Sequence, residues 1–264
     1  MPARPTIDLN CDMGERPGAD GVAADERLME FVTSVNIACG GHAGDEETAA
    51  AVMGAAAARR LSIGAHPGYA DRANFGRVSV AMTADELEAM IAEQLRWFTR
   101  IASRAGCVVT HVKPHGALYH DVMEREDAAG AFMRAVRSLD GAWGGQAGRV
   151  PVLVGLFGST RPARWRAEGF AVAAEAFADR RYRADGGLVA RSEAWAVIAD
   201  PGEAAEQAVD IAVHRCASAA GGVLVPVIAD TICVHSDSPG AEGTARRVRE
   251  ALEHEGCGLK GLGG

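Results

Sequence analysis

Residues 107–119 read CVVTHVKPHGALY, an apolar run that ends in two histidines, a lysine and a proline. Side chains alternate between the two faces of a strand, so Val109, His111 and Lys113 share one face. Pro114 cannot donate a hydrogen bond to a sheet, which places the end of the strand at this residue. Because burying an unpaired charge is costly, we expect the lysine and the two histidines to have partners or a functional role at this strand end.

Six more short apolar runs are also typical of strands, and a helical pattern follows each of them. The seven predicted strands are Thr6–Asn10, Val35–Cys39, Ser62–His66, Val108–Lys113, Val152–Gly155, Val172–Glu175 and Ala229–His235. Strands that alternate with helices imply a parallel sheet with right-handed crossovers. We therefore predict one domain over residues 1–264, a seven-stranded parallel β/α barrel, and keep an open doubly wound sheet as the alternative.

Local signals mark the starts of several helices. Thr83 and Glu86 form a capping box before an apolar stripe. Asp200, which a proline follows, is a predicted N-cap. The first helix is expected near residues 25–33, and the last is expected to open at residues 238–239.

Size and composition exclude several classes of protein. The 264 residues carry a formal net charge of −8, which argues against a nucleic-acid surface, since such a surface needs a basic stripe. No apolar run reaches the roughly 20 residues of a membrane span, and the N-terminus has no apolar signal segment. Six scattered cysteines with no CxxC pair are typical of buried thiols in a reducing compartment. We expect a cytoplasmic protein with no membrane or nucleic-acid partner.

Polar and ionisable residues gather where the predicted strands end. They are Asn10, Asp12, Glu15, Asn36, His42, His66, His111, Lys113, His115, Glu175, Arg180, His235 and Asp237. In barrels and in open α/β sheets, ligands bind at the carboxyl ends of the strands. Six separate segments therefore deliver polar groups to one predicted rim.

Each of these residues also has an ordinary structural explanation when it is taken alone. A histidine at a strand end is often a buried structural residue, and Asp45 is well placed to cap the following helix. Asp179 and Arg180 can form an ordinary surface ion pair. Because six segments show the same pattern, the joint pattern predicts an active site.

The residue types at this rim favour acid–base chemistry on a polar substrate. A lysine can neutralise an oxyanion or a phosphate, and aspartate with histidine can hold a divalent metal that activates water. The chain has no GxSxG elbow and no GxGxxG after a strand. GGHAGD at residues 40–45 is no phosphate loop, because it lacks the lysine and the hydroxyl residue of a Walker motif.

Six stretches taken together resemble the LamB/YcsF family. They are IDLNCDMGE (7–15), VNIACGGHAGD (35–45), IGAHPGYADRANFGR (63–77), HVKPHGALY (111–119), EAFADRRYRADGGLVARS (175–192) and DTICVHSDSPGA (230–241). They span nearly the whole chain in the order of the family. The chain departs from the family at Gly41, where phenylalanine is usual, and at residues 235–241, where HGDTPGA is usual. Its loop over residues 16–25 is also shorter.

The resemblance implies a barrel related to glycoside hydrolases and deacetylases. It also implies the ATP-dependent opening of the lactam 5-oxoproline to L-glutamate, with Mg²⁺ accompanying the ATP and with two partner subunits, B and C. The expected catalytic residues are Asp12, Glu15, His66, Lys113, His115 and Asp237. The expected substrate-binding residues are Asn10, Asn36, His42, His111, Glu175, Arg180 and His235.

The expected roles follow from the chemistry of a lactam. Lys113 is expected to face the phosphate or oxyanion, with its amine near Asp12. Asp12 or Glu15 would position or deprotonate water, and His66 and His115 would exchange protons with the ring nitrogen. Arg180, which follows the sixth strand, would bind the substrate carboxylate, because a guanidinium matches it with two hydrogen bonds.

Two other functions stay open at this point. The first is a stand-alone metal-dependent amide hydrolase or deacetylase, with Asp12, His42 and His66 as candidate metal ligands. The second is a non-catalytic substrate-binding subunit, in which Asp12→Asn and Lys113→Ala would leave turnover of the complex intact. The residues do not decide which group is the base or whether a divalent metal is bound.

Overall fold

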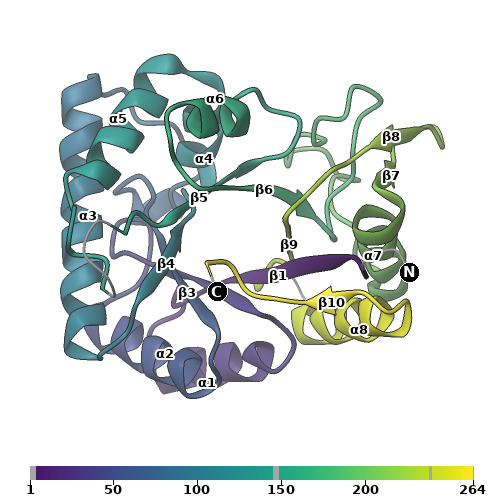
Figure 1. Cartoon of the computed structure of the whole chain (residues 1–264), viewed down its shortest axis with the longest axis horizontal. Coiled ribbons are helices and arrows are strands. Elements are labelled where there is room, and N and C mark those ends of the chain that lie inside the picture. Colours follow the sequence, from purple (N-terminus) through teal and green to yellow (C-terminus); the bar gives the residue numbers. More distant parts are fainter. Residues whose placement is uncertain (1–3, 145–148, 238–239, 264) are drawn as a thin grey trace.

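Seven parallel strands close into a barrel. The structure, a computed structural model, describes residues 4–144, 149–237 and 240–263. Within these residues the barrel strands are β1 (Thr6–Met13), β2 (Ser34–Ala38), β3 (Ser62–His66), β4 (Val109–Val112), β5 (Val152–Leu156), β6 (Val172–Phe177) and β9 (Thr231–Cys233). Neighbours pair in parallel, and β9 pairs with both β6 and β1, which closes the ring (Figure 1). The predicted barrel is confirmed, and the open sheet is excluded.

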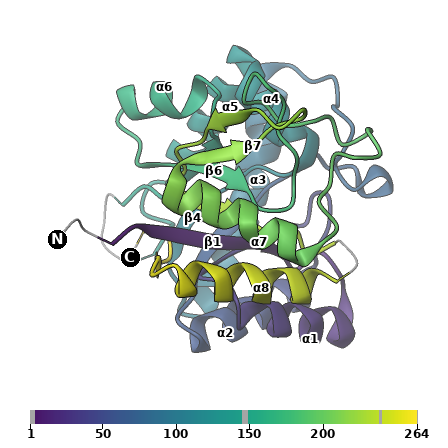
Figure 2. The ribbon, with the colours of Figure 1, turned by 90° about the vertical axis from the view of Figure 1, so that its right-hand side faces the viewer.

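Helices surround this ring of strands (Figure 1). They are α1 (Gly18–Met29), α2 (Glu46–Ala58), α3 (Ala84–Arg104), α4 (Gly116–Glu124), α5 (Glu126–Arg137), α6 (Arg161–Ala167), α7 (Pro201–Val209) and α8 (Ala241–His254). Two short elements are a 3-10 turn, η1 (Arg72–Asn74), and a π-helical turn, η2 (Asp210–His214). Helices α7 and α8 pack side by side on one flank of the barrel (Figure 2).

Local capping signals placed three helix starts correctly. The capping box of Thr83 and Glu86 opens α3. Asp200 caps α7, and Asp45 caps α2 by accepting a hydrogen bond from the amide of Thr48. Such caps satisfy amides that have no partner within the helix, which is why a short sequence signal is enough to find them.

The start of the first helix was predicted too late. Helix α1 begins at Gly18, and Asp25 lies buried within it. The carboxylate of Asp25 accepts a 2.7 Å hydrogen bond from the amide of Gly14, so this residue fastens the helix to the end of β1. The predicted opening at residues 238–239 lies outside the described residues, and α8 begins at Ala241.

Three short strands were not predicted. β7 (Cys216–Ser218) and β8 (Leu224–Pro226) form an antiparallel hairpin outside the barrel. β10 (Gly258–Leu259) adds in parallel to the first residues of β1. Strands of two or three residues give little alternation, and among the short strands only β9 was recognised, because it lies within the predicted run 229–235.

The inside of the barrel is polar near β1. Leu9, Cys11 and Met13 on one face of β1 are completely buried in the apolar core. Asp8 and Asn10 on the other face are also buried, and their side chains bond to strands elsewhere in the ring. Barrel interiors are usually filled by branched apolar side chains. Here a hydrogen-bonded network occupies part of that space and supports the rim above it.

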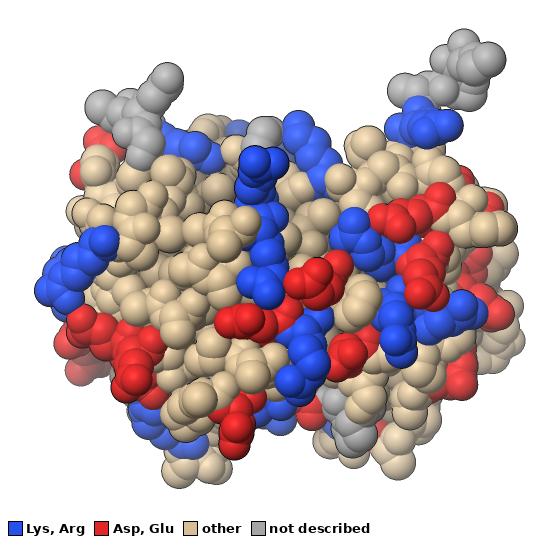
Figure 3. Space-filling view, turned by 90° about the horizontal axis from the view of Figure 1, so that it is seen from below, with Lys and Arg blue, Asp and Glu red and all other residues tan. Residues whose placement is uncertain are grey.

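The surface carries both signs of charge. Acidic and basic side chains are interspersed on the face that presents α1, α2 and α8 (Figure 3). Among the described residues, none of the helices has the length and apolar character needed to cross a membrane. That residues 1–264 form one domain stays a prediction.

Candidate active site

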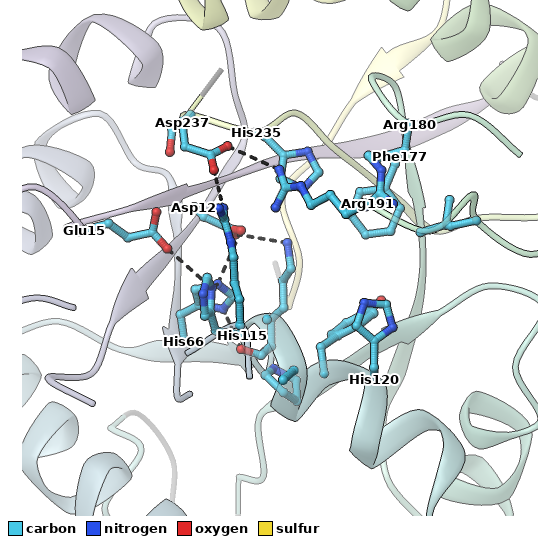
Figure 4. Close-up of a pocket in the computed structure, with 18 of the residues that line it drawn as sticks. Asp12, Glu15, His66, His115, His120, Phe177, Arg180, Arg191, His235 and Asp237 are labelled. Carbon is cyan, nitrogen blue, oxygen red and sulfur yellow. Dashed lines mark hydrogen bonds and ion pairs between the residues drawn. The ribbon is translucent and has the colours of Figure 1, made fainter. Parts of the chain in front are cut away.

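A pocket of about 350 Å³ opens at the carboxyl ends of the barrel strands (Figure 4). The six residues predicted to be catalytic all line it: Asp12, Glu15, His66, Lys113, His115 and Asp237. Of the predicted substrate-binding residues, Arg180 and His235 line it as well. The structure thus brings together groups from strands and loops that are far apart in the sequence.

The other predicted binding residues do not line this pocket. Asn10, Asn36, His42, His111 and Glu175 are all at most 1% exposed. They lie behind the pocket wall, where four of them bond to residues that face the pocket and His111 bonds to Asn36. Alternation along β4 correctly grouped His111 with Lys113 on one face, but it gave no depth along the barrel.

Lys113 stands at the centre of the site. Its ammonium lies 3.0 Å from Oδ1 of Asp12 and 2.8 Å from Oε1 of Glu175. The expected proximity of Lys113 to Asp12 is therefore confirmed. Burial alone would lower the pKa of Lys113, but Asp12, Cys233 and Glu175 outweigh burial and hold it well above its usual value. The lysine is thus a charged donor at the pocket floor.

Asp12 is the carboxylate that links this cation to the histidines. It accepts a 2.8 Å hydrogen bond from Nδ2 of Asn36, and its Oδ2 lies 3.3 Å from Nε2 of His66. Burial raises the pKa of Asp12, but His66 and Lys113 outweigh burial and hold that pKa well below its usual range. An ionised carboxylate therefore stands beside the ammonium at the pocket.

His111 supports this arrangement from behind. Its Nε2 lies 2.8 Å from Oδ1 of Asn36, and its Nδ1 lies 2.8 Å from Oγ1 of Thr110. Burial lowers the pKa of His111 to about 3, so the ring is neutral. Gly64 on the neighbouring strand leaves room for it, because a Cβ there would lie 2.1 Å from Nε2 of His111. His111 thus orients Asn36, which in turn bonds Asp12.

A histidine cluster forms one side of the pocket. One ligand atom from each of Glu15, His42, His66 and His115 lies within 4.8 Å of the others, so the four could hold a metal ion. Burial lowers the pKa of His42 and that of His115 to about 2, and burial raises the pKa of Glu15 to about 7. Asp12, a predicted metal ligand, lies beside this cluster and is not part of it.

Two arginines at the pocket were missed. Arg77 follows β3 and Arg191 follows β6, and both pair with the carboxylate of Asp237. Both residues lie within the stretches that resemble the family. Neither is on a strand, so the alternation of strand side chains could not place them.

Arg180 and its neighbour Asp179 have separate partners. Arg180 is 5% exposed, and its Nη2 donates a 2.7 Å hydrogen bond to the carbonyl of Val189. Its Nε has no hydrogen-bond partner among the described residues. Asp179 is buried and pairs with Nδ1 of His235 at 2.8 Å. Asp179 and Arg180 therefore do not form the surface ion pair that was considered as their ordinary structural explanation.

The fold and the pocket define a class of protein: a seven-stranded parallel β/α barrel with an acid–base site at the carboxyl ends of its strands. Residues 7–263 match the model of the LamB/YcsF family. The chain belongs to this family, as its six sequence stretches predicted.

Full-length relatives agree with this assignment. The chain is 44% identical to the A subunit of 5-oxoprolinase from Streptomyces griseus, over 96% of this chain and 98% of that protein. It is 40% identical to the A subunit of 5-oxoprolinase from Methylococcus capsulatus, over 98% and 96% of the two chains. A crystal structure of a lactam utilization protein from Thermus thermophilus is similar, with a TM-score of 0.88, 35% identity and coverage of 97% and 100%.

The departure from the family at Gly41 has a structural counterpart. A Cβ at Gly41 would lie 2.5 Å from Oε1 of Gln94. Gln94 bonds both the amide and the carbonyl of Gly68, at 3.1 and 2.7 Å. Gln94 thus occupies the space beside Gly41 and fixes the backbone that follows β3.

Proposed function

We propose that this chain is the A subunit of an ATP-dependent 5-oxoprolinase, which opens the lactam of 5-oxoproline to L-glutamate together with subunits B and C. The names of the full-length relatives support the reaction. The observation that carries the proposal is the Lys113–Asp12 pair at the floor of a pocket that is also lined by Arg180. A cation, a carboxylate and a guanidinium suit a small anionic amide.

The reaction explains why such a site is needed. A five-membered lactam is a resonance-stabilised amide, and its carbonyl carbon is a poor electrophile. Transfer of the γ-phosphoryl group of MgATP to the carbonyl oxygen makes that carbon reactive and releases ADP. Water then adds to the carbon, the ring C–N bond breaks and the nitrogen takes a proton. A second water hydrolyses the resulting acyl phosphate to glutamate and phosphate.

Two residues at the pocket floor suit the charged steps. The ammonium of Lys113 faces the oxygen on which negative charge develops, where a fixed donor stabilises the transition state. Asp12 is ionised and adjacent, so its carboxylate can orient the attacking water and accept its proton. Asp237 holds Arg77 and Arg191 at the mouth of the same pocket.

Arg180 is the proposed partner of the substrate carboxylate. Its guanidinium is nearly buried and lines the pocket, and its Nε has no hydrogen-bond partner among the described residues. A carboxylate matches such a group with charge-assisted hydrogen bonds. His235 lies on the same side and is held by Asp179.

Subunits B and C are proposed to supply part of the ATP handling. The sequence contains no Walker-type loop, so phosphoryl transfer within this chain alone is not expected. The six cysteines of the chain are unpaired, which supports the proposed cytoplasmic location.

The test is the release of glutamate from 5-oxoproline, measured with this chain alone, with subunits B and C alone, and with all three. We expect ATP-dependent release only from the complete set. Full turnover by the isolated chain, or by B and C without it, would reject the proposal. Amide hydrolysis by this chain without ATP would instead support a stand-alone metal hydrolase.

A further inference from the structure

The histidine cluster in the pocket wall has an unusual pattern of hydrogen bonds. Nδ1 of His66 lies 2.7 Å from the carbonyl oxygen of Lys113, and Nε2 of His115 lies 2.9 Å from the carbonyl oxygen of Phe75. Carbonyl oxygens only accept, so each of these ring nitrogens carries a hydrogen. In the neutral form of each ring the opposite nitrogen is therefore unprotonated, whereas a cationic His66 would donate from Nε2 to Asp12.

The two unprotonated nitrogens face one another. Nε2 of His66 and Nδ1 of His115 are 3.1 Å apart. Two lone pairs at this distance repel unless a positive charge lies between or beside them. Hydrogen bonds from the distal nitrogen of a ring to backbone carbonyls are also the usual way in which proteins orient histidines that bind a metal.

The donors of Glu15 and His42 lie close enough to share an ion with the two histidines. Oε1 of Glu15 lies 3.2 Å from Nε2 of His42 and 3.5 Å from Nδ1 of His115. Four ligands at the usual zinc distances would be about 3.3–3.4 Å from one another. The separations of 3.1, 3.2 and 3.5 Å lie near this value, and one ligand atom of each residue lies within 4.8 Å of those of the other three.

The scaffold holds this set in place. The ring of His42 is 1% exposed. It stacks on that of His115 at an interplanar angle of 7°, so binding of one ion by both rings requires His115 to turn out of the stack. A Cβ at Gly68 would lie 2.6 Å from Nδ1 of His42, and one at Gly76 would lie 2.7 Å from its Cβ. The backbone thus packs directly against His42. Nδ1 of His42 has no hydrogen-bond partner among the described residues, and burying a polar atom without a partner is costly.

We propose that Glu15, His42, His66 and His115 bind one divalent transition-metal ion in the wall of the pocket, with zinc as the best fit. Three imidazoles and one carboxylate suit zinc, whereas Mg²⁺ prefers oxygen ligands. The site deepens the proposed function, since the pocket belongs to that proposal. It is distinct from the Mg²⁺ that accompanies ATP.

The proposal changes the roles expected of the histidines. As ligands, His66 and His115 hold the cation and do not exchange protons with the lactam nitrogen. Asp12, 3.3 Å from Nε2 of His66, then lies between the metal site and the ammonium of Lys113. The alternative is a proton on His66, which would bond Asp12 and need no metal.

Metal content distinguishes these alternatives directly. The full chain, produced without a polyhistidine tag, is dialysed against metal-free buffer and analysed by elemental mass spectrometry. We expect close to one zinc per chain. Chelated protein titrated with Co²⁺ should bind one ion and develop the intense visible absorption of four-coordinate cobalt. Zn²⁺ should displace the cobalt, and excess Mg²⁺ should not.

Variants locate the site. Glu15→Gln and His66→Gln should each weaken Co²⁺ binding by about 100-fold or more, because loss of even an outer-shell partner costs roughly 10- to 100-fold. His120→Gln is the matched control, since His120 lines the same pocket outside the cluster. Circular dichroism shows which variants fold. If His66→Gln does not fold, the site is tested by comparing Co²⁺ binding of Glu15→Gln with that of His120→Gln.

Two results would overturn the metal site. The first is that folded wild-type protein holds far less than one ion per chain after loading with zinc or cobalt. The second is that Glu15→Gln and His120→Gln bind Co²⁺ with the same affinity. Neither measurement uses substrate, ATP or a partner protein. Metal binding without 5-oxoprolinase activity of the complete set would therefore reject the proposed function alone. Full activity of the metal-free complex would reject a catalytic role of the metal. The metal content and the Co²⁺ titration would still decide whether the site exists.

Discussion

The ammonium of Lys113 lies 3.0 Å from Oδ1 of Asp12, although the two residues come from opposite sides of the barrel. Lys113 directly follows β4, and Asp12 lies on β1. The pair is almost fully buried, so removing one partner leaves an uncompensated charge in the interior. Stability and chemistry therefore depend on the same contact.

Replacing Lys113 with alanine is expected to reduce the turnover of the complete enzyme by on the order of 100-fold, with little change in KM for 5-oxoproline. The reason is that its ammonium acts on charge that develops in the transition state. Steady-state kinetics of the three-subunit enzyme measure both constants. The chain has one other lysine, the exposed Lys260, so Lys260→Ala is the matched control. A folded Lys113→Ala protein with near-normal turnover would end the catalytic role.

The same lysine is expected to matter for stability. Lys113→Met leaves the carboxylates of Asp12 and Glu175 without their cation. Loss of one partner of a buried ion pair typically costs about 3–5 kcal/mol. Chemical denaturation measures this loss, and an unchanged midpoint would show that the two carboxylates are stable without the ammonium.

Arg180→Gln is expected to raise KM for 5-oxoproline by on the order of 10- to 100-fold, because it removes charged hydrogen bonds to the substrate carboxylate. Arg181→Gln is the control. Arg181 is bound to Glu203 at 2.7 and 3.0 Å and does not line the active-site pocket. An equal rise in KM for both variants would contradict the specific role of Arg180.

Gly64→Ala is expected to destabilise the fold, because its Cβ would collide with the ring of His111, which two hydrogen bonds hold in place. Overpacking of this kind typically costs about 1–3 kcal/mol. Gly54→Ala is the matched control, since nothing lies within 4 Å of a Cβ at this position on α2. That change should stabilise the helix by roughly 0.5–1 kcal/mol. Thermal unfolding of both variants tests the pair, and equal shifts in Tm would show that the space beside His111 is not limiting.

The pH dependence of stability should reflect Asp8. Burial raises the pKa of this carboxyl from 3.8 to about 6, although hydroxyls of Ser34, Thr231 and Thr33 donate to it. The folded state therefore binds the proton more tightly than the unfolded state does. The resulting stabilisation is fully present below pH 3.8 and is lost as the pH rises through about 6.

Asp8→Asn cannot titrate, so it isolates this contribution. The free energy of unfolding of the variant, relative to the wild type, should rise by up to about 3 kcal/mol between pH 4 and pH 7. Urea denaturation at several pH values gives this difference. A difference that stays flat across the range would show that Asp8 has the same pKa in both states.

Much of the site was visible in the sequence because it follows strand ends. The residues predicted to be catalytic, from Asp12 to Asp237, all reached one pocket. Arg77 and Arg191 were missed because loops carry no periodic signal. His42, expected to bind substrate, lies behind the wall, since a sequence shows that a residue follows a strand but not how deep it sits.

The sequence by itself determined the seven strands, several helix starts and the rim to which polar residues belong, because apolar runs, prolines and caps act over a few neighbouring residues. Only the tertiary structure decided that the interior of the barrel is partly polar, since strands buried on both faces do not reveal which face is inward. It also decided that Lys113 pairs with Asp12 and that Glu15 joins three histidines. Those contacts join segments distant in the sequence, and closure of the ring brings them together.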